Sequence, residues 1–390
     1  GILKNTGLKR FNFRTNLNGK SKDSRLNYGT SLTGNYSKSK LATNLGTGDI
    51  NQNFVIGGLQ GLPYLSPEDY PGDGAGMVEY YRNSRGLSST PLMLMDKAKY
   101  FKYQQNEFKM IVQGNLSYKL TESLTAGTSV GVDYTTVNSS MYDDPASFNS
   151  VLFGSASTGQ EYNGFQSESY STVFSFNSTS YLKWAKSYGL HSINAGVYLE
   201  YLKAHNKASS LNQEGLHPYF ATPGGGTGWI PYSTDNEFYV PSISQSRATA
   251  GLFSYFGNVD YDYNTRYGVG VTVRRDASFR FADSNRWGTF YSVSARWNIS
   301  NEKFMENATA VTDLKLRGSY GTAGNQDIMG TGLFGGANLY QTLYGFGRGY
   351  NNEPSLMLTQ LPNPDLKWET ITQSNIGLDF GLWENRLRGT

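Results

Sequence analysis

The sequence contains no cysteine, few prolines and no long apolar segment. With Cys 0 in 390 residues, a disulfide scaffold and a metal site held by thiolates are both excluded. No run approaches the roughly 18 consecutive apolar residues that mark a transmembrane helix. A membrane-crossing β-barrel is still allowed, because its apolar residues are interleaved with polar ones along each strand.

Aromatic residues and glycine, by contrast, are abundant. Aromatics make up 14% of the chain, which is too many large rings for a disordered polypeptide. Gly 45 against Pro 12 suits extended strands better than helices. Lys and Arg dominate residues 1–40, where Asp23 is the sole carboxylate. This pattern favours a solvated wall and turn over a nucleic-acid patch, so no nucleic-acid partner is predicted.

The clearest structural signal is a pair of alternating segments, 248–263 and 267–273, joined by a short Asn-Thr link. Large apolar residues alternate with small or polar ones in both, which predicts an antiparallel hairpin with one apolar and one polar face. In an outer-membrane barrel Val271 would face lipid and Thr272 would face the wet lumen. In a soluble sandwich the valine face would pack on a second sheet.

Similar alternation recurs along the whole chain and predicts eleven strands, with a twelfth beginning near Arg386. The expected strands are 8–18, 24–40, 107–120, 124–136, 167–185, 191–207, 248–263, 267–281, 287–298, 314–324 and 367–381. One helical turn is expected in 301–310 after a Ser300 cap.

The connections between these strands alternate between short and long. Short links follow residues 18, 120, 185, 263, 298 and 382, and longer ones follow 40, 138, 208, 281 and 324. Alternate connections lie at the same end of an up-and-down sheet, so one end would carry tight turns and the other long loops. Membrane barrels have this asymmetry, whereas a Greek-key sandwich has no reason to show it.

Several stretches resemble SusC/RagA-type TonB-dependent outer-membrane transporters. They are residues 363–370 (NPDLKWET), 375–380 (NIGLDF), 314–326 (LKLRGSYGTAGNQ), 292–304 (SVSARWNISNEKF) and 10–17 (RFNFRTNL). The resemblance implies an all-β, antiparallel up-and-down transmembrane β-barrel with long extracellular loops and short periplasmic turns. This chain would supply about 12 strands of a barrel of roughly 22 strands with a plugged lumen.

The resemblance also implies how the chain is organised. Residues 1–390 would form part of one receptor barrel domain. The chain starts at Gly1 without a recognisable leader. The signal peptide, the plug, the TonB-contacting segment and the final strands are expected to lie outside it.

The resemblance further implies a function, which is import of an oligosaccharide or a peptide across the bacterial outer membrane. A SusD-like surface lipoprotein would close over the loops, and TonB with its ExbB–ExbD motor would act through the missing N-terminal part. No enzyme activity and no cofactor are implied. The alternatives are an outer-membrane binding or adhesion barrel without active transport, and a secreted all-β hydrolase, for which no paired carboxylates are evident.

Motifs that could carry catalysis or bind metal are weak. Ser129 lies in a G-x-S-x-G match, but the match falls inside an alternating strand rather than at the strand-to-helix turn that a nucleophile needs. The histidines lack the helical spacing of a metal site. Glu68, Asp69 and Asp73 do not have the spacing of a helix-loop-helix calcium site, and the sequence leaves open whether any loop binds calcium. The glycine-rich stretches at 224–228 and 345–349 are interpreted as flexible loop.

Aromatic residues in two long loops are the candidate substrate-binding or partner-binding residues, because rings beside planar polar groups suit sugars and peptides. They are Tyr219, Phe220, Trp229, Tyr232, Phe238, Tyr239, Tyr340, Tyr344, Phe346 and Tyr350. Trp229 is flanked by glycines, so its ring is expected to need a ligand, a partner or another loop to cover it. The alternative is that all these rings only pack the loops together.

Overall fold

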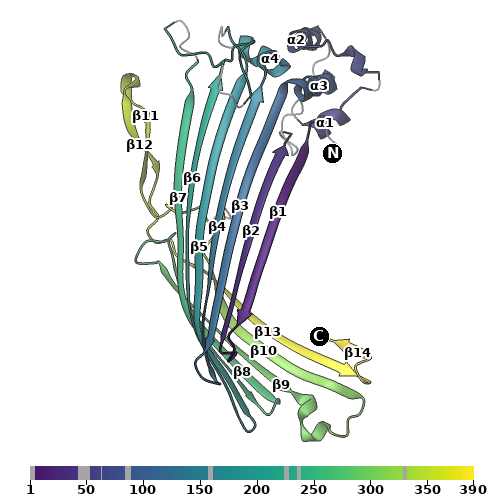
Figure 1. Ribbon diagram of the computed structural model, residues 1–390, viewed down its shortest axis with the longest axis vertical. Coiled ribbons are helices and arrows are strands. Elements are labelled where there is room, and N and C mark those ends of the chain that lie inside the picture. The colour runs from purple at the N-terminus through teal and green to yellow at the C-terminus, as the bar shows by residue number, and fades with distance from the viewer. Residues whose placement is uncertain are drawn as a thin grey trace.

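A computed structural model describes residues 5–42, 53–62, 64–83, 89–156, 161–223, 228–234, 239–327 and 332–390. Its main element is an antiparallel sheet of 12 strands in which every strand pairs with its neighbours along the chain. Figure 1 shows the sheet as a curved wall, with β1 and β14 at its two edges. The strands are β1 (Gly7–Lys20), β2 (Leu26–Lys40), β3 (Phe101–Lys119), β4 (Leu124–Asp143), β5 (Phe165–Tyr188), β6 (His191–Glu214), β7 (Ser242–Tyr263), β8 (Tyr267–Ser278), β9 (Trp287–Asn298), β10 (Val311–Asn325), β13 (Glu369–Leu382) and β14 (Leu387–Gly389).

The predicted strands and their up-and-down order are confirmed, but several strands are longer than expected at the loop end. For example, β6 continues to Glu214 and β4 to Asp143. The sequence prediction stopped where apolar residues cease to alternate with polar ones. Beyond that point the backbone ladder continues even though neither face is apolar, so the pattern no longer reports the strand.

Tight turns close one end of the sheet. Asn264, Thr265 and Arg266 link β7 to β8. The φ angles of Asn264 and Thr265 are 49° and 55°, positive as at the centre of tight hairpin turns, and the Arg266 amide donates to the Tyr263 carbonyl at 2.9 Å. The Thr265 amide donates to Asp262 Oδ1 at 2.9 Å, which holds the turn. The expected helical turn after Ser300 is wrong in detail. Two 3₁₀ turns form instead, η4 (Ile299–Asn301) and η5 (Lys303–Met305), and neither has a side-chain cap.

The opposite end carries helices and a separate hairpin in the segments that were expected only as long connections. The elements are α1 (Phe54–Leu59), η2 (Pro67–Asp69), α2 (Gly74–Asn83), α3 (Thr90–Tyr100), α4 (Phe148–Ala156), β11 (Leu343–Arg348), η6 (Tyr350–Asn352) and β12 (Pro354–Gln360). Figure 1 shows the helices gathered at the loop ends of the first strands, with the β11–β12 hairpin standing near β7. No helix in the described parts of the chain is both long and apolar enough to cross a membrane.

The helices pack around a small core, here called the loop core, formed by Met77, Val78, Leu92, Met93 and Phe148. Local signals explain the helices. The Asn53 side chain accepts hydrogen bonds from the Val55 and Ile56 amides at 3.0 and 3.1 Å and so caps α1. A proline in the first turn of α3 is compatible with its start, because the amide that proline lacks is unpaired there in any helix.

Strand register carries two distinct faces across the sheet. On β6, β7 and β8 the apolar face has Val197, Leu199, Val259, Val269, Val271 and Val273. Tyrosine and tryptophan border this face at both margins: Tyr263, Tyr267 and Trp297 at the turn end, and Tyr255, Trp287 and Tyr291 at the loop end. On the same strands the polar face has residues such as Asn194, Asn258, Asp260, Thr272 and Ser294. Most of the apolar face is left uncovered by the chain itself.

Candidate functional site: the polar face and the aromatic loops

Three aromatic rings, here called the ring row, cross the polar face on adjacent strands. Register places Tyr181 of β5 opposite Tyr198 of β6, and Tyr198 opposite Phe256 of β7. The Tyr198 and Phe256 rings stack with centroids 4.5 Å apart and planes inclined by 6°, and Tyr181 lies 6.2 Å from Tyr198. Cross-strand aromatic pairs of this kind stabilise a sheet and fix the orientation of each ring.

A cation lies at each end of the ring row. Lys183 Nζ is 4.4 Å from the Tyr181 centroid, and the Arg274 guanidinium is 4.7 Å from the Phe256 centroid. Arg274 is held in turn by Glu200 at 2.6 Å and Asp276 at 2.7 Å. The result is a fixed row of rings with a cation over the ring at each end. The Phe256 ring is covered by Tyr198 on one side and by the Arg274 guanidinium on the other, so the row offers ring edges and fixed polar groups to a ligand.

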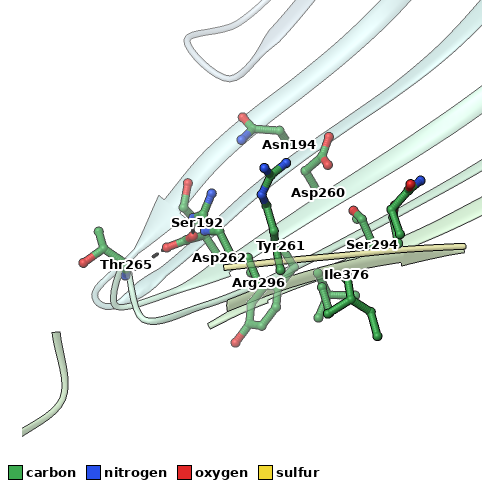
Figure 2. Close-up of a pocket in the computed structure, with 18 residues that line it drawn as sticks. Ser192, Asn194, Asp260, Tyr261, Asp262, Thr265, Ser294, Arg296 and Ile376 are labelled. Atoms are coloured by element: carbon green, nitrogen blue, oxygen red, sulfur yellow. Dashed lines mark hydrogen bonds and ion pairs between the residues drawn. The ribbon is translucent and has the colours of Figure 1, made fainter. Parts of the chain in front are cut away.

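A polar basin of about 840 Å³ lies nearer the tight turns, on β6 to β10 and β13. Asp262 forms an ion pair with Arg296, and Arg317 and Lys315 both pair with Asp379, at 3.2 and 2.9 Å. Figure 2 shows Asn194 and Asp260 on one side of the sheet and Tyr261 and Ile376 on the other. The charged groups of the basin are mostly paired with one another, so this part of the wall is polar without a strong field of one sign.

The loop between β6 and β7 holds some of the candidate rings inward and leaves others exposed. The Trp229 indole N–H donates to Oε1 of the fully buried Gln166 at 3.0 Å, and Trp229 also bridges to Leu216. The ring of Tyr239 is buried, and its hydroxyl accepts the Tyr162 amide at 2.7 Å. Both residues therefore help to hold this loop on the end of β5.

The exposed rings of the same loop are Tyr219, Phe220 and Tyr232. The Phe220 ring lies 4.4 Å from the His217 ring, which also stacks on Tyr162. This links the exposed rings to the packed part of the loop. Phe238 lies outside the described residues.

The β11–β12 hairpin exposes most of its large side chains. Phe346 is 92% exposed and Tyr350 97% exposed, and Tyr344 is exposed beside them. Leu356, Met357 and Leu358 of the partner strand are exposed as well. Tyr340 is half-buried before the hairpin. Within the described residues, no ring contact joins this group to the rings of the β6–β7 loop.

The glycine-rich stretch 345–349 is part of this ordered hairpin, so its interpretation as flexible loop is wrong. Gly345 and Gly347 lie directly beside the side chains of Thr359 and Met357. A side chain at either glycine would displace these neighbouring side chains. The two glycines therefore leave the space that Thr359 and Met357 occupy. Residues 224–227 of the other glycine-rich stretch lie outside the described residues.

The loop core contains one buried carboxyl group that the sequence reading did not single out. Asp96 accepts hydrogen bonds from the Phe148 amide at 2.6 Å and from the Tyr70 hydroxyl at 2.8 Å. Burial raises the pKa of Asp96 above its usual value, and these hydrogen bonds only partly oppose that rise. Asp96 joins α3 to the start of α4 and to the segment before α2.

The weaker motifs have structural explanations. Ser129 lies inside β4, paired with Asn115 and Thr179, far from any strand-to-helix turn. Asp69 accepts the Ser66 amide at 2.7 Å in a capping box, and Asp73 accepts the Gly76 amide at 2.8 Å. The described residues contain no group of three or more acidic or histidine side chains placed to hold a metal ion.

The architecture and the faces of the sheet can be compared with known families. The family model described as TonB dependent receptor-like, beta-barrel matches residues 4–390. The chain belongs to this family. Among curated relatives, TonB-dependent receptor P39 of Formosa agariphila is 26% identical over 92% of this chain and 31% of its own length. TonB-dependent receptor SusC of Bacteroides thetaiotaomicron is 28% identical over 79% of this chain and 28% of its own length.

Solved structures agree on the fold. The RagAB peptide transporter superposes with a TM-score of 0.76 at 23% identity, covering 98% of this chain and 39% of that chain. The siderophore receptor PiuA from Acinetobacter baumannii has a TM-score of 0.51 at 12% identity, covering 98% of this chain and 49% of that one. The chain spans 31% of the length of P39 and 28% of the length of SusC. By its family model and its similarity to SusC and RagAB, it is of the SusC/RagA type.

Membership of this TonB-dependent receptor family gives the two faces their environments. In an outer-membrane barrel the apolar face meets lipid and the polar face lines the lumen, with tyrosine and tryptophan at the membrane margins. The ring row and the basin therefore face the lumen of the receptor. Its tight turns are periplasmic, and the loop core and the β11–β12 hairpin are extracellular.

Proposed function

We propose that this receptor imports a bulky nutrient, an oligosaccharide or a peptide, across the outer membrane. The observation that carries the proposal is the set of exposed rings at the extracellular end, Phe346 and Tyr350 above all. Large exposed rings on this hairpin form a surface whose burial by a ligand or a partner would be favourable. The ring row adds fixed ring edges and charged groups on the lumen face.

Partners of this receptor are part of the proposal. We infer that a SusD-like surface lipoprotein covers the extracellular loops, and that TonB supplies the energy for release into the periplasm. Similarity to SusC and to the RagAB peptide transporter supports this inference. The RagAB name favours a peptide, while rings beside amide groups suit glycans equally well, so both substrate classes need to be tested.

The test is growth and uptake in a strain that lacks the gene, supplied with single oligosaccharides or single peptides. Wild-type full-length protein should restore growth on one substrate class. A Phe346→Ala, Tyr350→Ala double variant at matched protein level should lower uptake at limiting substrate by about tenfold, as expected for losing roughly 1 to 3 kcal/mol of ring contact. Phe304→Ala is the matched control, because that exposed ring lies at the tight-turn end of the sheet.

A second measurement, uptake with and without TonB, distinguishes active import from passive adhesion. If the receptor is an importer, removing TonB abolishes uptake of labelled substrate and leaves surface binding intact. Substrate binding without any TonB-dependent uptake would instead support the adhesion barrel.

A further inference from the structure

Charge is segregated between the two faces of β6, β7 and β8. Every carboxylate on these strands lies on the lumen face: Glu200, Glu214, Asp260, Asp262 and Asp276. Of the Lys and Arg residues, only Arg274 faces the lumen, where it is paired. The remaining four face outward: Lys203, Lys207, Arg247 and Arg275. All charged side chains on the outward face of these strands are therefore cationic.

Arg275 lies nearest to the apolar band. Its register partner on β7 is Tyr255, at the loop-end margin of the lipid face. The guanidinium is 5.2 Å from the centroid of Trp287, whose ring lies 5.7 Å from Tyr255. Within the described residues Arg275 has no ion pair, whereas its neighbour Arg274 has two. The guanidinium is thus exposed at the membrane margin and held against rings.

A groove of about 620 Å³ lies on the lipid face next to Arg275, on the side toward the tight turns. Its floor is Gly257, whose register partners Val197 and Val273 form the sides. Leu182 borders the groove on the β5 side, and Arg275 borders its loop end. The groove exists because Gly257 is the one residue of the outward row of β7 between Phe253 and Tyr263 that lacks a side chain.

We propose that this groove and Arg275 form a binding site for a phosphate-bearing lipid of the outer leaflet. An acyl chain lies over Gly257, between Val197 and Val273, and the headgroup phosphate binds the Arg275 guanidinium. Charge complementarity selects this occupant: the groove is apolar, it opens to the bilayer, and an unpaired cation lies at its headgroup end. Arginine suits phosphate because its planar donors can bind two oxygens together.

The experiment measures lipid binding to the purified full-length protein by native mass spectrometry. The probes are bis-phosphorylated lipid A and the same lipid A after enzymatic removal of its phosphates. Wild-type protein should retain the phosphorylated form at least tenfold more strongly. Arg275→Gln should remove that preference, whereas Arg275→Lys should keep most of it.

Two matched controls separate a site from general attraction. Lys207→Gln removes another outward cation, on β6, and should change retention less than twofold. Gly257→Leu fills the groove and should weaken retention of both lipids by about fivefold. A β-carbon at Gly257 would meet the Gly196 carbonyl oxygen at 3.4 Å, which is ordinary contact. Gly251→Leu changes an outward glycine of the same strand outside the groove and should have little effect.

Several outcomes would overturn the proposal. Equal losses in Arg275→Gln and Lys207→Gln would reduce the effect to nonspecific charge. Unchanged retention in Gly257→Leu would remove the acyl chain from the groove. Displacement of the lipid by inorganic phosphate at millimolar concentration would mean that the site serves a soluble anion and no lipid. If Arg275→Gln fails to assemble, comparing lipid retention in Gly257→Leu and Gly251→Leu still tests whether the groove binds the acyl chain.

Discussion

The β-sheet wall and the loop core of this receptor are stabilised in opposite ways. In the wall, large side chains such as Val271 and Val273 are not covered by other parts of the chain and face lipid. The strands are held together by the hydrogen bonds between their backbones. In the loop core, Met77, Leu92 and Phe148 are fully buried and exclude water. The wall should therefore respond to the polarity of a substitution, and the loop core to its volume.

The largest effect is expected at the edges of the wall. β1 and β14 border the sheet, and an unpaired strand edge in hydrocarbon costs several kcal/mol for each unsatisfied backbone group. A polypeptide of residues 1–390 alone should therefore not form a stable membrane-inserted monomer. Gel mobility with and without heating checks this. A heat-resistant monomer in detergent would show that these edges close without further strands.

Removing volume from the loop core comes next. Phe148→Ala should destabilise the packing of α2, α3 and α4 by about 3 to 5 kcal/mol, because it leaves a cavity among buried side chains. Hydrogen exchange should rise in these helices and stay unchanged in β4 to β8. Val55→Ala, at an exposed position of α1, is the control. Equal loss of protection in helices and wall would mean that the two regions form one cooperative unit.

Changing polarity in the wall sharpens the comparison from the other side. Val271→Arg should cost about 2 to 4 kcal/mol if the residue lies near the bilayer midplane, and Thr272→Arg on the lumen face should cost far less. Reversible folding into lipid vesicles measures both. Similar costs at the two positions would contradict the assignment of the faces.

Trp229 lies where the wall meets a different extracellular segment, since it joins the β6–β7 loop to Gln166 near the start of β5. Our hypothesis is that Trp229→Ala weakens substrate uptake or lipoprotein association by about tenfold while the barrel still assembles, the equivalent of roughly 1.4 kcal/mol. Trp229→Phe keeps the ring and loses only the indole donor. Unchanged uptake and association in Trp229→Ala, at matched protein level, would leave this ring as loop packing.

The smallest expected effect is a pH dependence confined to the loop core. The pKa of Asp96 is raised in the folded state, so folding of the loop core takes up a proton. Its stability should rise as pH falls from neutral through the raised pKa and level off below the unfolded pKa. Limited proteolysis at pH 7.5 and pH 5 measures this. Asp96→Asn should reduce the difference. Burial also raises the pKa of Asp143, at the loop end of β4, to about 6, so Asp143→Asn should reduce it as well. An unchanged difference in the double variant would assign the effect to another group.

The sequence predicts the wall well because lipid on one side and water on the other impose a period of two, seen in residues such as Val269 to Val273. It predicts the extracellular end poorly because that environment imposes no such period. The segment with Pro67 and Gly74 was expected only as part of the long connection after residue 40, yet Pro67 lies in the first turn of η2 and Gly74 begins α2. The closeness of Gly345 and Gly347 to the opposite strand depends on the hairpin register, which no short pattern reveals.

The candidate site was predictable in its residue types and only partly in its placement. Aromatic residues such as Phe346 and Tyr350 are exposed, but composition could not separate them from Tyr239, whose burial depends on contacts with residues far away along the chain, such as Tyr162. The ring row was missed because Tyr181, Tyr198 and Phe256 are distant in sequence. Only the register of three strands brings them together.

Because the strands differ in length, the extracellular edge of the sheet is uneven. β5 and β6 have 24 residues each, while β8 and β9 have 12 each. At about 3.3 Å per residue, the first pair is roughly 40 Å longer along the strand than the second. Figure 1 shows the long strands rising well beyond the ends of the short ones. The two flanks of the extracellular end are therefore built differently: on one the paired strands β5 and β6 themselves extend outward, and on the other the strands are short and the β11–β12 hairpin extends outward instead.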